Sequence, residues 1–150
     1  SKAFVQPKRY VFSKDLALDW NAPFFNLPGQ KVVVTSKRSL PKSAKNIKNL
    51  SLLNCKSKGR FLDPKNFIEK ISKFQINNIL LESGPNLLGS FGDSNLIDEF
   101  IFYISPEKLG SQAEYFYKGK NKINFFDNKQ FDIVEKTLVG KDKKIILRKK

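Results

Sequence analysis

The chain has 150 residues, with 28 Lys and Arg against 14 Asp and Glu, no His, no Met and one Cys. This is the length of one domain, and a hydrophobic share of 40% with 13% aromatic residues is enough to build a core. Without His there can be no Ser-His-Asp triad, Cys-His pair or imidazole zinc site, and one Cys forms neither an internal disulfide nor a tetrathiolate cage. Hydrolytic and structural-zinc functions are therefore poor candidates, and we predict no metal site.

No apolar run approaches the roughly 20 residues that a membrane helix needs, and the N-terminus lacks the pattern of a signal peptide. We therefore expect a soluble, cytoplasmic protein with no membrane partner. The single thiol, Cys55, agrees with a reducing compartment.

The net charge of +14 raises the question of a nucleic-acid partner. Of the 28 basic residues 24 are Lys, whereas specific recognition of phosphates and bases usually uses the Arg fork. Codon bias toward A and T explains this composition better than a functional basic face does. Moreover, no basic residue lies between Lys73 and Lys108, a segment that contains Glu82, Asp93, Asp98, Glu99 and Glu107. Nucleic acid is therefore a disfavoured partner.

The first half of the chain contains three strand-like runs. Residues Lys8–Ser13 and Lys31–Thr35 are predicted strands, and the second is bounded by Pro-Gly in front and a polar segment behind. Between them, the apolar stretch Trp20–Phe25 is irregular and should pack on the body of the protein. Leu50–Leu53 predicts another short strand.

Two helices are predicted in the middle of the chain. Asp63 is an N-cap residue before Pro64, and apolar residues recur behind it at helical spacing: Phe67, Ile68, Ile71 and Phe74. Residues Ile79–Leu81 then predict a buried strand. Gly84-Pro85 opens a second, shorter helix that Gly92 should close, with Leu87, Leu88 and Phe91 on one side.

The last third predicts more β-structure. Phe100–Ile104 is expected to be a fully buried strand, and Phe131–Val139 and Ile145–Leu147 should pair as a hairpin around Gly140-Lys141-Asp142. Strands that alternate with helices and end in a hairpin indicate an α/β fold with a mixed sheet.

The sharpest local feature runs from Ile79 to Ser90. A strand, a carboxylate at its end (Glu82), a glycine turn (Gly84) and a helix start follow one another. Ligands of α/β proteins gather at the carboxyl ends of strands, and a helix N-terminus offers unpaired N–H groups to a phosphate. Taken alone, however, the motif more often marks an ordinary strand-to-helix turn with a solvated glutamate.

The wider pattern from Asn77 to Gly110 resembles the C-terminal reductase domain of the bacterial riboflavin-biosynthesis bifunctional deaminase/reductase, which is dihydrofolate-reductase-like. Weaker similarity extends to Gln6–Ser13, Lys31–Thr35 and the Gly140 turn. The residues that match in register are Glu82, Gly84, Leu87, Leu96, Asp98, Glu99, Pro106, Leu109 and Gly110.

The resemblance implies one reductase-like domain over residues 1–150, with a mixed sheet flanked by helices. It implies NADPH-dependent reduction of the ribosyl group of a phosphorylated ribosylaminopyrimidine to the ribityl form. Glu82 would contact the substrate, and no residue is assigned as catalytic, since the nicotinamide transfers the hydride. The cofactor contacts would be Gly84, Pro85, Asn86, Leu87, Leu88, Gly89 and Ser90.

Further implications concern neighbouring residues and partners. Lys37 or Arg38, after the second strand, could meet the 2′-phosphate that distinguishes NADPH from NADH, although solvated loop positions are equally expected there. Asp98 and Glu99 are expected at a strand entry rather than as a catalytic pair. Relatives of this type are commonly dimers, which makes a homodimer an expectation.

The N-terminal part of the family domain, with its Lys-x-Ala-x-Ser-Leu-Asp-Gly strand, has no match in the chain, so the residues correspond to the C-terminal two-thirds of that domain. The deaminase half has no match either. One alternative is therefore a catalytically inactive nucleotide-binding or partner-binding relative. The least favoured alternative is a basic nucleic-acid-binding protein that uses Lys118–Lys122 and Lys141–Lys150.

Overall fold

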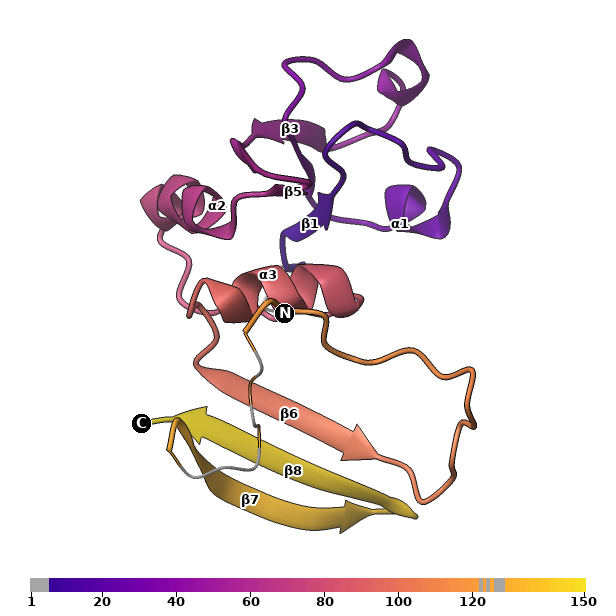
Figure 1. The fold of residues 1–150 in the computed structure, drawn as a ribbon. Coiled ribbons are helices and arrows are strands. Elements are labelled where there is room, and N and C mark those ends of the chain that lie inside the picture. The colour runs from indigo at the N-terminus through magenta and orange to yellow at the C-terminus, as the bar shows by residue number, and fades with distance from the viewer. Residues whose placement is uncertain (1–5, 122, 124, 126–128) are drawn as a thin grey trace, which may run out of the picture. The chain divides into compact units, whose positions relative to one another are not determined.

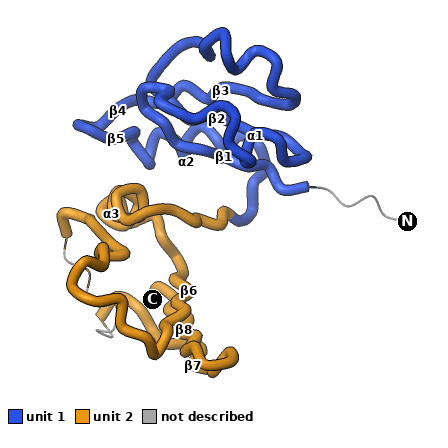
Figure 2. The backbone as a smooth tube through the Cα atoms, turned by 90° about the vertical axis from the view of Figure 1, so that its right-hand side faces the viewer, with its two compact units in different colours: residues 1–78 blue, residues 79–150 orange. Residues whose placement is uncertain are grey.

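The computed structural model describes residues 6–121, 123, 125 and 129–150 (Figure 1). The chain divides into two compact units, residues 1–78 and 79–150, each with its own sheet (Figure 2). One reductase-like domain over residues 1–150 stays a prediction. Among the helices that the structure describes, none has the length and apolar character needed to cross a bilayer.

The first unit is built on a three-stranded parallel sheet. Strands β1 (Arg9–Phe12), β2 (Lys31–Thr35) and β3 (Leu50–Asn54) pair in the order β1-β2-β3. Every residue of β2 is buried, as a central parallel strand requires, and its run of valines supplies apolar side chains to both faces of the sheet. The three strands predicted from the sequence are confirmed.

Short elements surround this sheet. Helix α1 (Pro23–Asn26) buries Phe25, and Pro41 precedes the 3₁₀ turn η1 (Lys42–Ala44). Strands β4 (Ser57–Lys58) and β5 (Phe61–Leu62) form a small hairpin.

Helix α2 (Pro64–Ile71) confirms the Asp63-Pro64 signal, and η2 (Ser72–Phe74) continues it. The Asp63 carboxylate accepts a hydrogen bond from the Lys65 N–H at 3.0 Å, which satisfies one of the free donors of the first turn. Phe67 is buried, and its ring lies 4.8 Å from that of Phe12 on β1. Phe74, predicted to share this face, is 57% exposed because the α-helix gives way to a 3₁₀ turn.

The second unit combines helix α3 (Pro85–Asp93) with an antiparallel sheet. Strands β6 (Glu99–Ile104), β7 (Phe131–Val139) and β8 (Asp142–Lys149) pair in the order β6-β8-β7. The turn between β7 and β8 contains Gly140 at φ 62°, where a side chain would be strained. The predicted C-terminal hairpin is confirmed.

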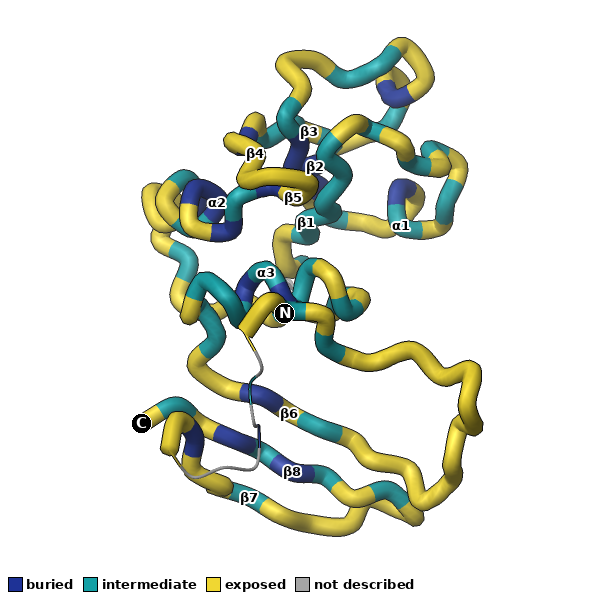
Figure 3. The backbone as a smooth tube through the Cα atoms, in the orientation of Figure 1, coloured by how far each residue is buried: buried dark blue, intermediate teal, exposed yellow. Residues whose placement is uncertain are grey.

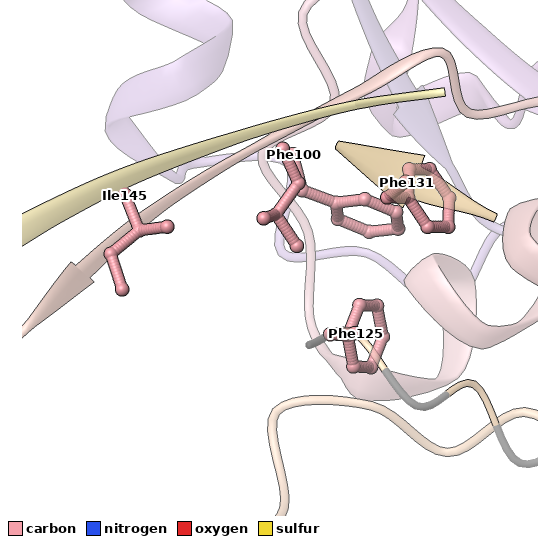
Figure 4. Packing of buried hydrophobic residues seen from close by; sticks show 5 residues of the cluster. Phe100, Phe125, Phe131 and Ile145 are labelled. Carbon is pink, nitrogen blue, oxygen red and sulfur yellow. The ribbon is translucent and has the colours of Figure 1, made fainter. Parts of the chain in front are cut away.

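The core of this unit is aromatic. The ring of Phe100 lies 4.9 Å from that of Phe125 and 5.3 Å from that of Phe131, both edge to face (Figure 4). Ile145 and Leu147, alternate residues of β8, belong to the same buried cluster. Figure 3 shows that β8 carries buried stretches whereas much of the rest of this sheet is exposed. Buried side chains therefore alternate with less buried ones in this part of β8, as in a sheet that is covered on one face only.

Three expectations about burial and boundaries are wrong. Residues Ile79–Leu81 form no strand, and Leu80 is 76% exposed, because no described strand pairs with this apolar run. Strand β6 is buried only at Phe100, whereas Tyr103 is 60% exposed, because its outer face is uncovered. Gly92 lies inside α3, which continues to Asp93.

The α/β class itself is confirmed, with parallel and antiparallel strand pairs both present. Within the described residues, however, the parallel pairs and the long antiparallel pairs lie in separate sheets rather than in one mixed sheet. An apolar run such as Ile79–Leu81 can only join a sheet where another strand supplies hydrogen-bond partners.

Candidate functional site

The N-terminus of α3 is open. Gly84 is its N-cap residue, in an extended conformation, and no side chain caps the helix. Pro85 has no N–H, and the first bond of the turn runs from the Leu88 N–H to the Gly84 carbonyl at 3.2 Å. The N–H groups of Asn86 and Leu87 therefore have no acceptor among the described residues. Two free donors and the positive end of the helix dipole together suit an anion.

The residues before this helix leave room for a ligand. A Cβ placed on Gly84 would meet nothing within 4 Å. Glu82 is exposed, and its carboxylate has no hydrogen-bond partner among the described residues. The Ser83 hydroxyl donates to the neighbouring Gly84 carbonyl at 3.3 Å. Glu82 therefore precedes the helix as a free acceptor, although it does not follow a strand as the sequence suggested.

The second turn of α3 is already engaged with the protein. Gly89 is buried, and a Cβ there would lie 2.5 Å from the Gly119 nitrogen and 2.5 Å from the Lys118 carbonyl carbon. Leu88 packs against the aromatic core, and the Ser90 hydroxyl donates to the Asn86 carbonyl at 3.0 Å. The predicted cofactor residues thus fall into an open first turn (Gly84, Pro85, Asn86, Leu87) and a packed second turn (Leu88, Gly89, Ser90).

One loop holds both ends of α3. The Lys118 N–H donates to the Pro85 carbonyl in the first turn at 3.0 Å. At the other end, the Asp93 carboxylate accepts from the N–H groups of Lys120 at 2.8 Å and Asn121 at 2.9 Å. The Tyr117 hydroxyl donates to the same carboxylate at 3.4 Å. We call residues 117–121 the clamp loop.

Two ionisable groups of this clamp have shifted pKa values. Burial alone would raise the pKa of Asp93, but the hydrogen bonds from Asn121, Lys120 and Tyr117 outweigh it and hold the pKa below its ordinary value. Burial, and then the charge and hydrogen bond of Asp93, raise the pKa of Tyr117 to about 12. The clamp therefore holds an ionised carboxylate against a neutral phenol over the whole neutral range.

Sequence reasoning missed both residues. The contact between Asp93 and the clamp loop spans 24 to 28 residues of chain, and nothing in the local pattern around Asp93 indicates it. The feature of the sequence that relates to this contact is the pair of glycines Gly92 and Gly119, which leave room for the Tyr117 ring. A Cβ on either glycine would lie within 2.6 Å of the Tyr117 hydroxyl oxygen.

Asp98 and Glu99 both lie at the entry of β6, where Asp98 is held through its backbone and Glu99 through its carboxylate. Glu99 begins β6 and accepts two hydrogen bonds from the Arg148 guanidinium on β8, at 3.1 and 2.8 Å. The Asp98 carbonyl accepts from the Lys149 N–H at 2.8 Å. They therefore anchor the entry of β6, as the sequence predicts.

A cavity of about 270 Å³ lies at the other end of α3, next to Asp93. Its walls include the core residues Phe100 and Phe131, and none of the predicted site residues lines it. It lies beside the clamp loop, whose residue Asn121 also lines it. No group of three or more His, Cys, Asp or Glu among the described residues could hold a metal ion.

Known relatives resemble this chain in sequence and structure. The model of the family described as RibD C-terminal domain matches residues 1–142. The riboflavin biosynthesis protein RibD of Buchnera aphidicola subsp. Baizongia pistaciae is 43% identical over 98 residues, which make up 65% of this chain and 26% of that protein. The 5-amino-6-(5-phosphoribosylamino)uracil reductase of Buchnera aphidicola subsp. Acyrthosiphon pisum is 32% identical over 80 residues, 53% of this chain and 39% of that protein.

Solved structures agree in fold. RibD of Acinetobacter baumannii superposes with a TM-score of 0.75 at 20% identity, covering 96% of this chain and 38% of that one. The riboflavin biosynthesis reductase Rib7 of Saccharomyces cerevisiae superposes with a TM-score of 0.69 at 15% identity, covering 96% of this chain and 70% of that one. The predicted reductase fold is thereby confirmed.

The chain spans about a quarter of the length of the Baizongia RibD protein that it matches. The family match, by contrast, covers nearly all of the residues here, and it includes the open helix N-terminus, Glu82 and the clamp loop. The chain belongs to the RibD C-terminal domain family.

Proposed function

We propose that this chain is the reductase portion of a riboflavin-biosynthesis enzyme, which uses NADPH to reduce the ribosyl group of a phosphorylated ribosylaminopyrimidine to the ribityl form. Family membership supports the reaction class, and the reductase name of one relative supports the substrate class. The observation that carries the proposal is the uncapped N-terminus of α3 behind the Glu82-Ser83-Gly84 turn.

The residues at this turn fit a dinucleotide phosphate. The Asn86 and Leu87 N–H groups can donate to phosphate oxygens, and Gly84 leaves the space through which an anion reaches the backbone. Helix α2 differs, because the Asp63 carboxylate already occupies its N-terminus. When bound, NADPH supplies the hydride, so the chain itself contributes binding, orientation and exclusion of water.

Glu82 fits the role of a substrate acceptor. Its carboxylate is exposed and has no described partner. No ion pair within the described residues therefore has to be broken before a hydroxyl or amino group of a ligand donates to it. A hydrogen bond to a charged group contributes more than a neutral one, and it orients the donor. A homodimer and a cytoplasmic location also stay predictions.

NADPH binding is the first test. We expect saturating NADPH to raise the melting temperature of the protein by a few degrees, because a ligand that binds only the folded state stabilises it. Differential scanning fluorimetry with NADPH measures this shift, with adenosine as the control ligand that lacks phosphates. Absence of any shift and of any binding by calorimetry would contradict the proposal.

Glu82→Gln tests the substrate contact. We expect kcat/KM for the ribosylaminopyrimidine to fall about tenfold, since a charged hydrogen bond is replaced by a neutral one, while the free energy of unfolding stays unchanged. Glu107→Gln, an exposed glutamate that follows β6, is the matched control and should retain full activity. NADPH binding without any turnover in the unaltered protein would instead favour the inactive nucleotide-binding relative.

A further inference from the structure

The cavity of about 270 Å³ beside Asp93 belongs to the second unit alone, because all the residues that line it lie within residues 79–150. Asp93 is the last residue of α3, whereas the open turn proposed for the cofactor is the first. At a rise of 1.5 Å per residue, Pro85 and Asp93 are about 12 Å apart along the helix axis. The cavity is therefore separate from the proposed cofactor site.

Three amide side chains line the cavity, those of Asn95, Asn121 and Gln130. All three residues are exposed, and none of these amides makes a hydrogen bond with another described residue. Each amide offers a carbonyl oxygen as an acceptor and an NH₂ group as a donor. The cavity thus carries donors and acceptors that the described part of the chain does not use.

The Asp93 carboxylate supplies a further acceptor. Its Oδ1 accepts from the Asn121 N–H at 2.9 Å and from the Tyr117 hydroxyl at 3.4 Å, whereas its Oδ2 accepts from the Lys120 N–H at 2.8 Å. A carboxylate offers about four acceptor positions, so one at Oδ2 stays open among the described residues. A ligand that carries an N–H group can fill it.

Aromatic side chains form the apolar part of the wall. Phe100 and Phe131 both line the cavity, with ring centroids 5.3 Å apart and ring planes at 76° (Figure 4). Aromatic rings pack favourably on such side chains, either stacked or edge to face. Ligand sites typically combine apolar and aromatic walls with a few polar groups, and drug-sized ligands occupy about 300 Å³ or more. The size of this cavity therefore favours a smaller ligand.

From these observations we infer that the cavity binds a small amino-substituted nitrogen heteroaromatic ring, at a site that the proposed function does not use. The amino group donates to Asp93 Oδ2, the ring nitrogens accept from the amide side chains, and the ring packs against Phe100 and Phe131. A phosphate group would meet the negative charge of Asp93, and a purely apolar ring would leave the amides without partners. Both alternatives fit this wall less well.

The test is a titration with 2-aminopyrimidine, followed in ¹⁵N–¹H correlation spectra of the assigned protein. We expect saturable shifts at the side-chain amides of Asn95 and Gln130 and at the backbone N–H of Asn121. Pyrimidine, which has the same ring without the amino group, should bind about tenfold more weakly because it gives Asp93 no donor. Equal affinity for the two rings, or no saturable shift at these residues, would overturn the inference.

Two variants test the polar groups one at a time. Gln130→Leu keeps the approximate size of the side chain and removes its amide, so we expect it to weaken 2-aminopyrimidine about fivefold. Gln112→Leu is the matched control, since Gln112 is also exposed in the second unit but does not line the cavity. Its affinity should stay within about twofold of the unaltered protein. Equal affinities of these two variants would overturn the inference.

Asp93→Asn tests the carboxylate. We expect it to weaken 2-aminopyrimidine about tenfold and to leave pyrimidine unchanged, because only the first ring donates to Asp93. The dispersion of the same spectra shows whether this variant is folded, and Gln130→Leu, which leaves Asp93 unaltered, decides if it is not. Equal losses for the two rings in a folded Asp93→Asn would overturn the inference.

The same spectra separate this site from the proposed function. NADPH should shift the backbone N–H groups of Asn86 and Leu87 at the first turn of α3, and 2-aminopyrimidine should not. A protein that binds 2-aminopyrimidine at the cavity but does not bind NADPH would contradict the proposed function and support this site. Shifts by 2-aminopyrimidine at Asn86 and Leu87 alone would assign the ring to the first turn and overturn the inference.

Discussion

Gly89→Ala is expected to destabilise the protein by about 2 kcal/mol, although alanine is the better helix former. The new Cβ would lie 2.5 Å from the Gly119 nitrogen and 2.6 Å from the Lys118 carbonyl oxygen, closer than real contacts allow. These are backbone atoms, so the clamp loop must move away from α3. Overpacking of this kind costs about 1–3 kcal/mol or more, against a gain of at most about 1 kcal/mol in helix propensity.

The measurement is the free energy of urea unfolding, with Gly84→Ala as the matched control. Gly84 is an N-cap residue with a φ of −67° and open space around its Cβ position, so alanine there should change stability by less than about 1 kcal/mol. Its methyl group would stand where an anion approaches, so NADPH binding should weaken instead. Equal stability of both variants would show that the contact of Gly89 with the clamp loop is not tight.

These two glycines show why a motif and its geometry are different kinds of information. The resemblance assigned residues Gly84 to Ser90 to the cofactor as one block. The structure places Gly84 in open space and Gly89 against the backbone of residues 118–119, which are 29 or more positions away in sequence. A pattern of residues gives the spacing along the helix, but it does not show what approaches each position.

Local signals predicted local structure well. The helix at Asp63-Pro64 was predictable because its cap, its proline and its apolar spacing all lie within one stretch, and the structure places a side-chain cap there. The strand Lys31–Thr35 was predictable because consecutive β-branched residues favour a buried parallel strand. In both cases the interactions that favour the conformation lie within the segment itself, or follow from the burial of its apolar side chains.

Non-local pairing was not predictable in the same way. Residues Ile79–Leu81 have the composition of a buried strand, yet no described strand pairs with them, and the side chain of Leu80 is exposed. Strand β6 has apolar residues on both faces, but only one face meets the aromatic core. Composition gives the preference for a strand, whereas the neighbouring strand that supplies the hydrogen bonds comes from elsewhere in the chain.

Asp93→Ala is expected to cost about 2 kcal/mol or more. It removes an ionised acceptor from two backbone N–H groups, those of Lys120 and Asn121, and from the Tyr117 hydroxyl. Hydrogen bonds to a charged group contribute about 1.5–3 kcal/mol each when buried, and partial exposure of this loop reduces their sum. Asp98→Ala, which removes an exposed carboxylate five residues away without a described side-chain partner, should change stability by less than about 0.5 kcal/mol.

The contribution of Asp93 should depend on pH with a defined sign. Its pKa in the folded protein lies below the ordinary value of 3.8, so the unfolded state binds the proton more readily. The stabilisation is therefore fully present above about pH 5 and is lost as the pH falls through 3.8 toward the lowered pKa. Asp93→Asn, which keeps one oxygen acceptor and cannot ionise, should lack this component of the acid transition.

The measurement is the free energy of unfolding of the unaltered protein and of Asp93→Asn between pH 7 and pH 3. The difference between the two should shrink as the pH falls, because protonation of Asp93 removes the charge that the variant already lacks. Tyr117→Phe, which keeps the ring between Gly92 and Gly119 and loses only the 3.4 Å hydrogen bond, should cost less than Asp93→Ala at every pH. A difference between the unaltered protein and Asp93→Asn that stays constant down to pH 3 would show that the ionised carboxylate is not what holds the clamp loop to the helix.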